Sequence, residues 1–166
     1  MSTDAITLLK DDHKQIKKLF REFQSAGENA TKVKAKIVDQ ILEALTVHTY
    51  IENEGMHPEV RKLLPAVEDD ILESYEEHHV ADVLCTELAA MSADDERFDA
   101  KTTVLIENVS HHIEEEEGEG FPTVRQALGR KLLQEIGARM LELREKAPRR
   151  PSAPGALKKA ADAVLS

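Results

Sequence analysis

The sequence contains little of what disulfide-rich, strand-rich or membrane-spanning proteins depend on. Its single cysteine, Cys85, cannot form an intramolecular disulfide and has no second thiol with which to build a zinc or redox pair. Tryptophan is absent, only 7 of the 166 residues are glycine and runs of β-branched residues are scarce, which disfavours strand-rich and dinucleotide-binding folds. No apolar run approaches the ~18 residues that a membrane-spanning helix needs. The remaining class is a single all-α domain.

The charge balance narrows the set of partners. Asp and Glu number 32 against 22 Lys and Arg, and the formal net charge at pH 7 is −10. Nucleic acid is therefore not an expected partner, because affinity for a phosphate backbone comes from clustered basic residues. The first ten residues lack a cationic start followed by a long apolar stretch, so we expect no secretory signal and a cytoplasmic protein. We expect no membrane partner, and a monomer or weak homodimer.

Apolar residues recur at helical spacing in four stretches, each long enough for a helix of a compact bundle. The predicted helices run from a cap at Thr3 or Asp4 to Gly27, from about Thr31 to His57 before Pro58, from about Asp69 to Met91, and from near Phe98 to a break at Gly118–Pro122. A further amphipathic helix is predicted over residues 128–146. The predicted fold is an all-α, up-down four-helix bundle with an extra C-terminal helix.

The composition changes after the last of these helices. Residues 148–155 read PRRPSAPG, which is too rich in proline and arginine to bury a core, so we expect a flexible linker there. Residues 157–165 are expected to form at most a short, marginal helix. The predicted organisation is one domain over residues 1–147 and a flexible tail over residues 148–166.

A repeat divides the chain into two helical hairpins. The second helix of each hairpin contains a His-x-x-x-Glu pair followed by proline, and the two copies lie 64 positions apart: His48 with His112, Glu52 with Glu116, and Pro58 with Pro122. The first helices are related by an offset of 65, which pairs Asp11-Asp12-His13 with Glu76-Glu77-His78. Each hairpin therefore supplies one histidine from its first helix and a His/Glu pair from its second.

The spacing of these residues points to metal binding. Residues at i and i+4 lie on one face of a helix, about 6 Å apart along the axis, so each His/Glu pair can direct both ligating atoms at one point inside the bundle. Two carboxylates can each bridge a pair of metals while four imidazoles fill terminal positions, and mixed N/O ligation without thiolate fits iron better than structural zinc. Burying two carboxylates and four imidazoles without a metal would be costly. We therefore predict a dinuclear iron site.

Four segments resemble the motifs of the hemerythrin-like family, also called the HHE cation-binding domain. They read DDHKQIKKLF, HTYIENEGMHP, EEHHVADVL and HHIEEEEGEGFP, and the resemblance covers roughly residues 3–145. It implies a four-helix bundle with an oxo- or hydroxo-bridged centre of two iron ions that binds O2 or handles peroxide or iron. Carried over residue by residue, it implies the metal ligands His13, His48, Glu52, His78, His112 and Glu116.

Three other histidines compete for roles in this scheme. His79 is an alternative to His78, although the helical register favours His78. His111 stands beside His112 but lacks a proline at the matching downstream offset. His57 precedes a proline, so we expect it in a turn at the surface.

The sequence differs from those of the O2-carrying hemerythrins at one expected metal-ligand position. Those proteins have a fifth histidine one helical turn from the third-helix ligand, whereas this sequence has Ser74 and Asp82 on either side of His78. An open coordination position favours peroxide chemistry over reversible O2 carriage. Asp82 can then take up protons, and Tyr75 can donate a hydrogen bond to bound oxygen species or serve as a core aromatic. Cys85 is expected to pack in the core.

The leading functional hypothesis is a non-heme di-iron protein that reacts with O2, H2O2 or NO. It would serve oxidative-stress defence, through catalase-like peroxide decomposition, or iron handling. The alternative is an O2, NO or iron sensor or carrier without turnover. A purely structural all-α interaction module is the third possibility.

Overall fold

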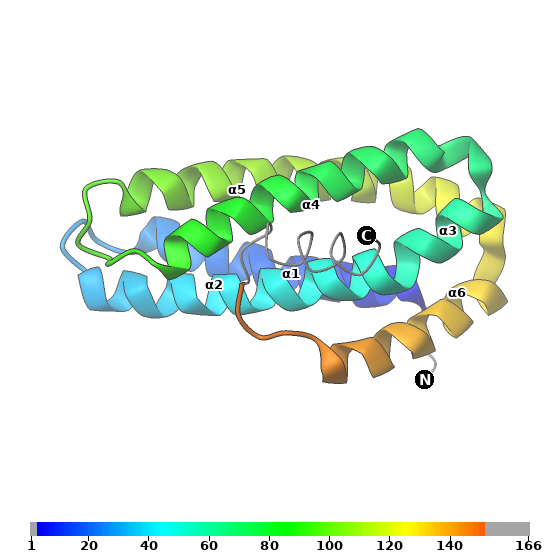
Figure 1. Ribbon diagram of the computed structural model, residues 1–166, viewed down its shortest axis with the longest axis horizontal. Coiled ribbons are helices and arrows are strands. Elements are labelled where there is room, and N and C mark those ends of the chain that lie inside the picture. Colours follow the sequence, from blue (N-terminus) through cyan, green and yellow to red (C-terminus); the bar gives the residue numbers. More distant parts are fainter. Residues whose placement is uncertain (1–2, 152–166) are drawn as a thin grey trace, which may run out of the picture.

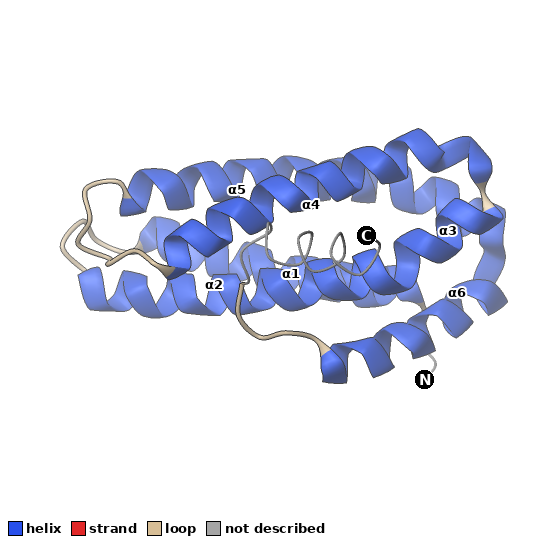
Figure 2. Cartoon of the chain, in the orientation of Figure 1, coloured by secondary structure: helices blue, strands red, loops and turns tan. Residues whose placement is uncertain are grey.

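The computed structural model describes residues 3–151, and throughout this range the chain is helical apart from short connections (Figure 2). The α-helices are α1 (Ala5–Ser25), α2 (Thr31–Ile51), α3 (His57–Leu63), α4 (Glu68–Ala89), α5 (Phe98–Glu115) and α6 (Phe121–Lys146). Two π-helical turns, η1 (Glu52–Met56) and η3 (Glu116–Gly120), and a 3₁₀ turn, η2 (Pro65–Val67), complete the chain order. The marginal helix predicted over residues 157–165 lies outside the described residues.

Helices α1, α2, α4 and α5 lie side by side and form the four-helix bundle (Figure 1). The α1–α2 and α4–α5 loops lie together at one end of the bundle, and α3 and the start of α6 lie at the other (Figure 1). The α6 helix then turns back and packs on α1 and α2. The predicted up-down bundle with an extra C-terminal helix is therefore confirmed.

The path of α6 depends on two glycines. Gly129 has a φ of 76°, which L side chains rarely adopt, and it bends the helix between its first two turns and the longer part that returns over the bundle. Gly137 lies so close to the start of α1 that an added Cβ would come within 2.5 Å of the carbonyl oxygen of Thr3. Asp4 caps α1 by accepting a hydrogen bond from the Thr7 amide at 2.8 Å, and it also pairs with Arg125 of α6.

The helices do not end at the prolines as predicted. In η1 the amide of His57 donates to the carbonyl of Glu52, and in η3 the amide of Phe121 donates to that of Glu116. These hydrogen bonds between residues i and i+5 accommodate one extra residue in each helix without ending it. The proline that follows lies in the first turn of the next α-helix, where a backbone N–H has no intrahelical acceptor and its absence is not destabilising. Both π-helical turns therefore obey the 64-residue repeat.

The apolar core consists of two clusters. One lies toward the loop end and includes Phe20, Leu45 and Leu105, together with the buried Cys85 that was predicted to pack there. The other joins the opposite end of the bundle to α6, through residues such as Leu9, Ile51 and Leu133. Along α1 and α4, a buried histidine, His13 or His78, lies between residues of the two clusters.

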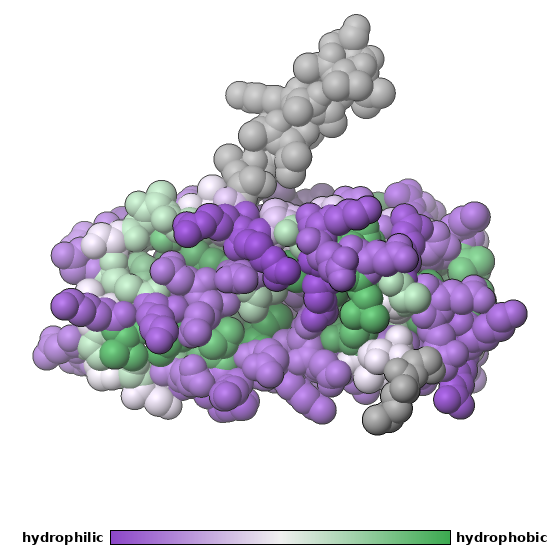
Figure 3. All heavy atoms as spheres, turned by 90° about the horizontal axis from the view of Figure 1, so that it is seen from below, coloured by the Kyte–Doolittle hydropathy of each residue, from purple (hydrophilic) through white to green (hydrophobic). Residues whose placement is uncertain are grey.

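Polar side chains cover most of the face seen in Figure 3, with apolar patches between them. Within residues 3–151, no helix is both long enough and apolar enough to cross a membrane.

Candidate metal centre

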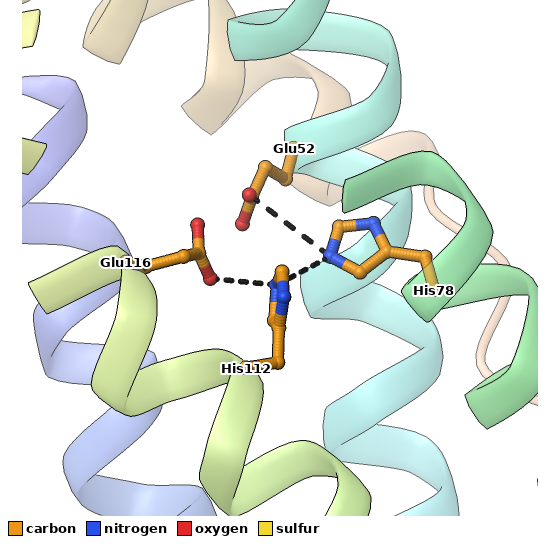
Figure 4. A group of neighbouring side chains, drawn as sticks. All are labelled: Glu52, His78, His112 and Glu116. Carbon is orange, nitrogen blue, oxygen red and sulfur yellow. Dashed lines mark hydrogen bonds and ion pairs between the residues drawn. The ribbon is translucent and has the colours of Figure 1, made fainter. Parts of the chain in front are cut away.

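The structure brings all six predicted ligands together in the middle of the bundle. Helices α1, α2, α4 and α5 contribute one histidine each, and the two glutamates are the first residues of η1 and η3. The side chain of Glu116 is 11% exposed, and the other five residues are buried. Figure 4 shows Glu52, His78, His112 and Glu116 pointing toward one another, with His112 and Glu116 on the same continuous helical segment.

These donor atoms form two groups that share a carboxylate. In the first, Nε2 of His112 lies 3.0 Å from Nε2 of His78 and 2.8 Å from Oε1 of Glu116, and Oε1 of Glu52 lies 4.0 Å from Nε2 of His78. In the second, Nε2 of His13 lies 3.6 Å from the same Glu116 oxygen. A third member of the second group is His48.

Glu52 connects the two groups as well. Its Oε2 atom lies 3.4 Å from Nε2 of His48, while its Oε1 atom faces the first group. The imidazole centroids of His13 and His48 are 4.9 Å apart. Both carboxylates therefore lie between two sets of histidines, as a pair of bridged cations requires.

Each of the four histidines is held by its outward-facing nitrogen. The acceptors are Asp12 for His48 at 3.0 Å, Glu77 for His112 at 3.1 Å, the Asn53 side-chain oxygen for His78 at 2.6 Å and Glu117 for His13 at 3.3 Å. An ionised carboxylate and an amide oxygen only accept hydrogen bonds, so Nδ1–H must be the donor in each case. Every Nε2 atom is thereby directed into the cluster, which is the usual support for metal-binding imidazoles.

This outer set of partners follows the repeat. The acid that precedes the first-helix histidine, Asp12 or Glu77, holds the second-helix histidine of its own hairpin. The residue after each ligand glutamate, Asn53 or Glu117, holds the first-helix histidine of the other hairpin. The two halves of the site are therefore related by an approximate two-fold arrangement that includes the outer partners.

The cluster contains buried polar atoms that have no hydrogen-bond partner. Among residues 3–151 there are seven such side-chain atoms, and five of them belong to the six predicted ligands: Nε2 of His13 and of His48, both oxygens of Glu52, and Oε1 of Glu116. Each such atom costs about 1–3 kcal/mol when it is left unpaired, and more when charged. Nitrogen lone pairs and carboxylate oxygens converging on shared points fit a pair of metal ions, which would satisfy all of them.

The charges in the cluster favour a positive charge beside Glu116, which in the metal-free protein is a proton on His112. Burial lowers the pKa of His78 far below its ordinary value, so this imidazole is neutral. Burial acts the same way on His112, but the carboxylate of Glu116 outweighs it and raises the pKa of His112 to about 9. Burial also disfavours the charged form of Glu116, yet the nearby imidazoles of His112 and His13 bring its pKa well below the ordinary value. In the metal-free protein His112 is therefore protonated beside Glu116, and metal binding would displace this proton.

The prediction for His57 was wrong, because this residue is only 3% exposed. Its Nε2 atom lies 2.9 Å from Oε1 of Glu52 and 3.2 Å from the Ser74 hydroxyl. The π-helical turn η1 continues the helix past the expected end and so turns this side chain inward. The repeat was the available signal, since the residue 64 positions later is Phe121, a residue type typical of cores.

The remaining candidates lie at different distances from the cluster. His79 and His111 are exposed, and His111 pairs with Glu115 of its own helix. The Tyr75 hydroxyl donates to the Asn53 carbonyl at 3.2 Å, and its ring packs edge-on against His57. Asp82 is hydrogen-bonded to Thr49, and burial raises its pKa to about 6.

Two cavities reach the cluster. The larger, of about 470 Å³, is lined at its inner end by Glu52, His57, His112 and Glu116. Its walls include Glu73, Glu77 and Glu115, which themselves stand close enough to share a cation. The smaller, of about 20 Å³, has room for a water molecule and touches His48, His78 and His112, with Thr49 in its wall.

Comparison with known proteins agrees with this geometry. The Hemerythrin HHE cation binding domain family matches residues 4–124. The chain belongs to this family. The HHE-domain chain is similar in fold to the crystal structure of a hemerythrin HHE cation binding domain-containing protein from Mycobacterium kansasii, with a TM-score of 0.70 and 23% identity over 87% of this chain and 89% of the other. No curated protein matches the chain. Membership of the HHE family identifies the chain as a metal-binding, hemerythrin-like protein.

Proposed function

We propose that this HHE-domain protein holds two iron ions and reacts with O2, H2O2 or NO. Decomposition of H2O2 is the leading activity, in oxidative-stress defence or iron handling. The observation that carries the proposal is the division of the possible ligand atoms into two groups that share Glu116, with one oxygen of Glu52 directed to each. The donors are nitrogen and oxygen without thiolate, a set suited to iron.

The proposed ligands keep the six positions predicted from the sequence: His13, His48, Glu52, His78, His112 and Glu116. When bound, the two irons would supply redox chemistry by storing two electrons. One H2O2 would be oxidised to O2 and would release two electrons and two protons. A second H2O2 would take up these electrons and protons and would be reduced to two waters. The chain's own part is to fix the imidazoles through their Nδ1 atoms, so that each Nε2 atom is directed into the cluster.

Asp82 is the candidate for proton transfer, and Tyr75 was the candidate for a hydrogen bond to bound oxygen species. Asp82 reaches the cluster through Thr49, whose side chain lines the small cavity beside His48 and His78. A carboxyl group with a pKa of about 6 can both accept and release a proton near neutral pH. Tyr75 stands farther out, because its hydroxyl is engaged with the Asn53 carbonyl, and we assign it to positioning His57 and η1.

The large cavity provides the entry route that small molecules need. Glu52, His57, His112 and Glu116 line it, so a molecule inside this cavity can reach the cluster. H2O2, O2 and NO are all uncharged, and the acidic walls do not repel them. The cytoplasmic location and the monomeric or weakly dimeric state remain predictions from the sequence.

The test is O2 evolution from H2O2 by the iron-loaded protein in an oxygen electrode. We expect steady evolution that is lost in Glu116→Ala, with Glu114→Ala, an exposed neighbour, as the matched control. A stable and reversible O2 or NO adduct without turnover would instead support the alternative, a sensor or carrier. Iron-loaded protein that does neither would contradict both functions.

A further inference from the structure

The two halves of the metal centre differ at one pair of equivalent positions. His57 and Phe121 are 64 residues apart, follow the two π-helical turns and occupy matching places. The His57 ring stacks on His78 with centroids 5.4 Å apart and planes at 15°. The Phe121 ring stacks on His13 with centroids 5.7 Å apart and planes at 11°. One half of the site therefore has an imidazole where the other has a phenyl ring.

The neighbours of these two rings differ in the same sense. Ser74, one turn before His78, has its hydroxyl 3.2 Å from Nε2 of His57. The equivalent residue one turn before His13 is Leu9, which belongs to the same apolar cluster as Phe121. A polar pair in one half thus corresponds to an apolar pair in the other, and the small Ser74 leaves room for the imidazole of His57.

The imidazole of His57 is placed at a donor atom of the cluster. Its Nε2 atom lies 2.9 Å from Oε1 of Glu52. This contact does not have hydrogen-bond geometry, and the Glu52 oxygen has no hydrogen-bond partner. That oxygen is the one directed toward the group of His78 and His112. Unlike the four histidines described above, His57 has no hydrogen-bond partner at its buried Nδ1 atom, and only its Nε2 atom is placed to contact the cluster.

We propose that His57 is a further metal ligand, bound through Nε2 to the ion held by His78 and His112. This inference rests on the proposed two-metal centre. One ion would then have three imidazoles and the other two, His13 and His48, in addition to the shared carboxylates. The apolar ring of Phe121 supplies no donor to the second ion, so the open position lies in that half. The two ions are therefore inequivalent although the bundle is nearly symmetric.

The test is a variant that copies one half of the site onto the other. His57→Phe with Ser74→Leu recreates the Leu9 and Phe121 pair that the fold already accommodates. Wild type and variant are loaded with ⁵⁷Fe(II), oxidised in air and examined by Mössbauer spectroscopy, and iron loss is followed against a chelator. His111→Phe, which alters an exposed histidine, is the control.

We expect wild type and control to show two distinct iron environments in equal amounts. In the double variant the two environments should converge, and one iron should be released about 10–100-fold more readily. Two irons with an unchanged spectrum and unchanged release in the variant would overturn the role of His57 and leave the two-metal centre intact. Wild type that does not hold two irons would contradict the two-metal centre itself.

A second variant keeps the test valid if the double variant does not fold, which circular dichroism would show. His57→Gln retains a polar side chain that can contact Glu52 and donate a hydrogen bond to it, but it removes the imidazole. A ligand role predicts the same convergence of the two iron environments. A wild-type spectrum in His57→Gln would show that His57 only positions Glu52, and would overturn the proposal.

Discussion

The Nδ1 atom of His48 lies 3.0 Å from Oδ2 of Asp12, and this contact links the metal centre to the helix that packs outside the bundle. Both oxygens of Asp12 lie 2.9 Å from an Nη2 atom of Arg144, near the end of α6. Burial disfavours the charged form of Asp12, but the hydrogen bond from His48 and the charge of Arg144 together outweigh it and lower the pKa of Asp12. The extra helix thereby supports a residue that fixes the orientation of a proposed ligand.

Asp12→Ala should weaken iron binding although Asp12 does not face the metal. Without the acceptor, the imidazole of His48 can rotate or change tautomer, and losses of about 10–100-fold in metal affinity are usual for such partners. The measurement is competition with a calibrated iron chelator. Asp11→Ala, at the exposed neighbouring position, is the control, and equal affinities in the two variants would remove Asp12 from the support of the site.

Glu52→Gln should have opposite effects on the metal-free and the iron-loaded protein. The carboxylate of Glu52 is fully buried and neither oxygen has a hydrogen-bond partner. A neutral amide therefore lowers the cost of burial, and we expect the free energy of unfolding of the metal-free protein to rise by about 1–3 kcal/mol. Iron affinity should fall in the same variant. Urea titrations with and without iron measure both effects, and Glu54→Gln in the same turn is the exposed control.

If Glu52→Gln destabilises the metal-free protein as well, the carboxylate has a structural partner that the cluster does not reveal. The interpretation of Glu52 as a metal bridge would then lose its main support.

The stability of the metal-free protein should depend on pH through Asp82. Burial raises the pKa of this carboxyl from 3.8 to about 6, so the folded protein retains a proton that the unfolded chain releases. Stability is therefore unaffected by Asp82 below about pH 4, falls as the pH rises toward 6, and stays reduced above it. Because the group is partly exposed, we expect about 1 kcal/mol.

Asp82→Asn should remove this pH dependence. Urea titrations at pH 4 and pH 7 should show the variant gaining about 1 kcal/mol over wild type at the higher pH only. A difference between variant and wild type that is the same at both pH values would contradict the raised pKa.

The acidic wall of the large cavity should accelerate iron entry. Glu73 and Glu115 lie in that wall, where their charges attract a divalent cation. In the variant Glu73→Gln/Glu115→Gln we expect uptake of Fe(II) to slow several-fold and to lose much of its dependence on ionic strength, while the final iron content is unchanged. Stopped-flow absorbance gives the rates, and exposed Glu76→Gln is the control. Equal rates in all three proteins would place the entry route elsewhere.

The fold and the six clustered residues could be predicted because they leave periodic signals. Apolar spacing identified the bundle helices, and the His-x-x-x-Glu repeat singled out side chains that a bundle directs to one point. The register also favoured His78, which is buried in the cluster, over the exposed His79.

The errors occurred where backbone geometry departs from the ideal helix. A π-helical turn has no side-chain signature, so Pro58 was interpreted as a helix end and His57 as a surface residue. Asn53 and Glu117 each contact a histidine of the other hairpin. These contacts depend on how the two hairpins pack against each other, which the local sequence does not specify. Gly129 in turn gives no sequence-level indication of the direction in which α6 folds back.

The central claim is that the cluster holds two metal ions bridged by Glu52 and Glu116. It is tested most directly by the iron content of the protein, measured by inductively coupled plasma mass spectrometry. The protein is first loaded with Fe(II), oxidised in air and separated from unbound metal. We predict about two irons per chain with near-ultraviolet charge-transfer bands in wild type, and loss of both in Glu116→Ala, because this residue belongs to both donor groups. Wild type that retains one iron or none, or a Glu116→Ala variant that retains two, would contradict the bridged two-metal centre.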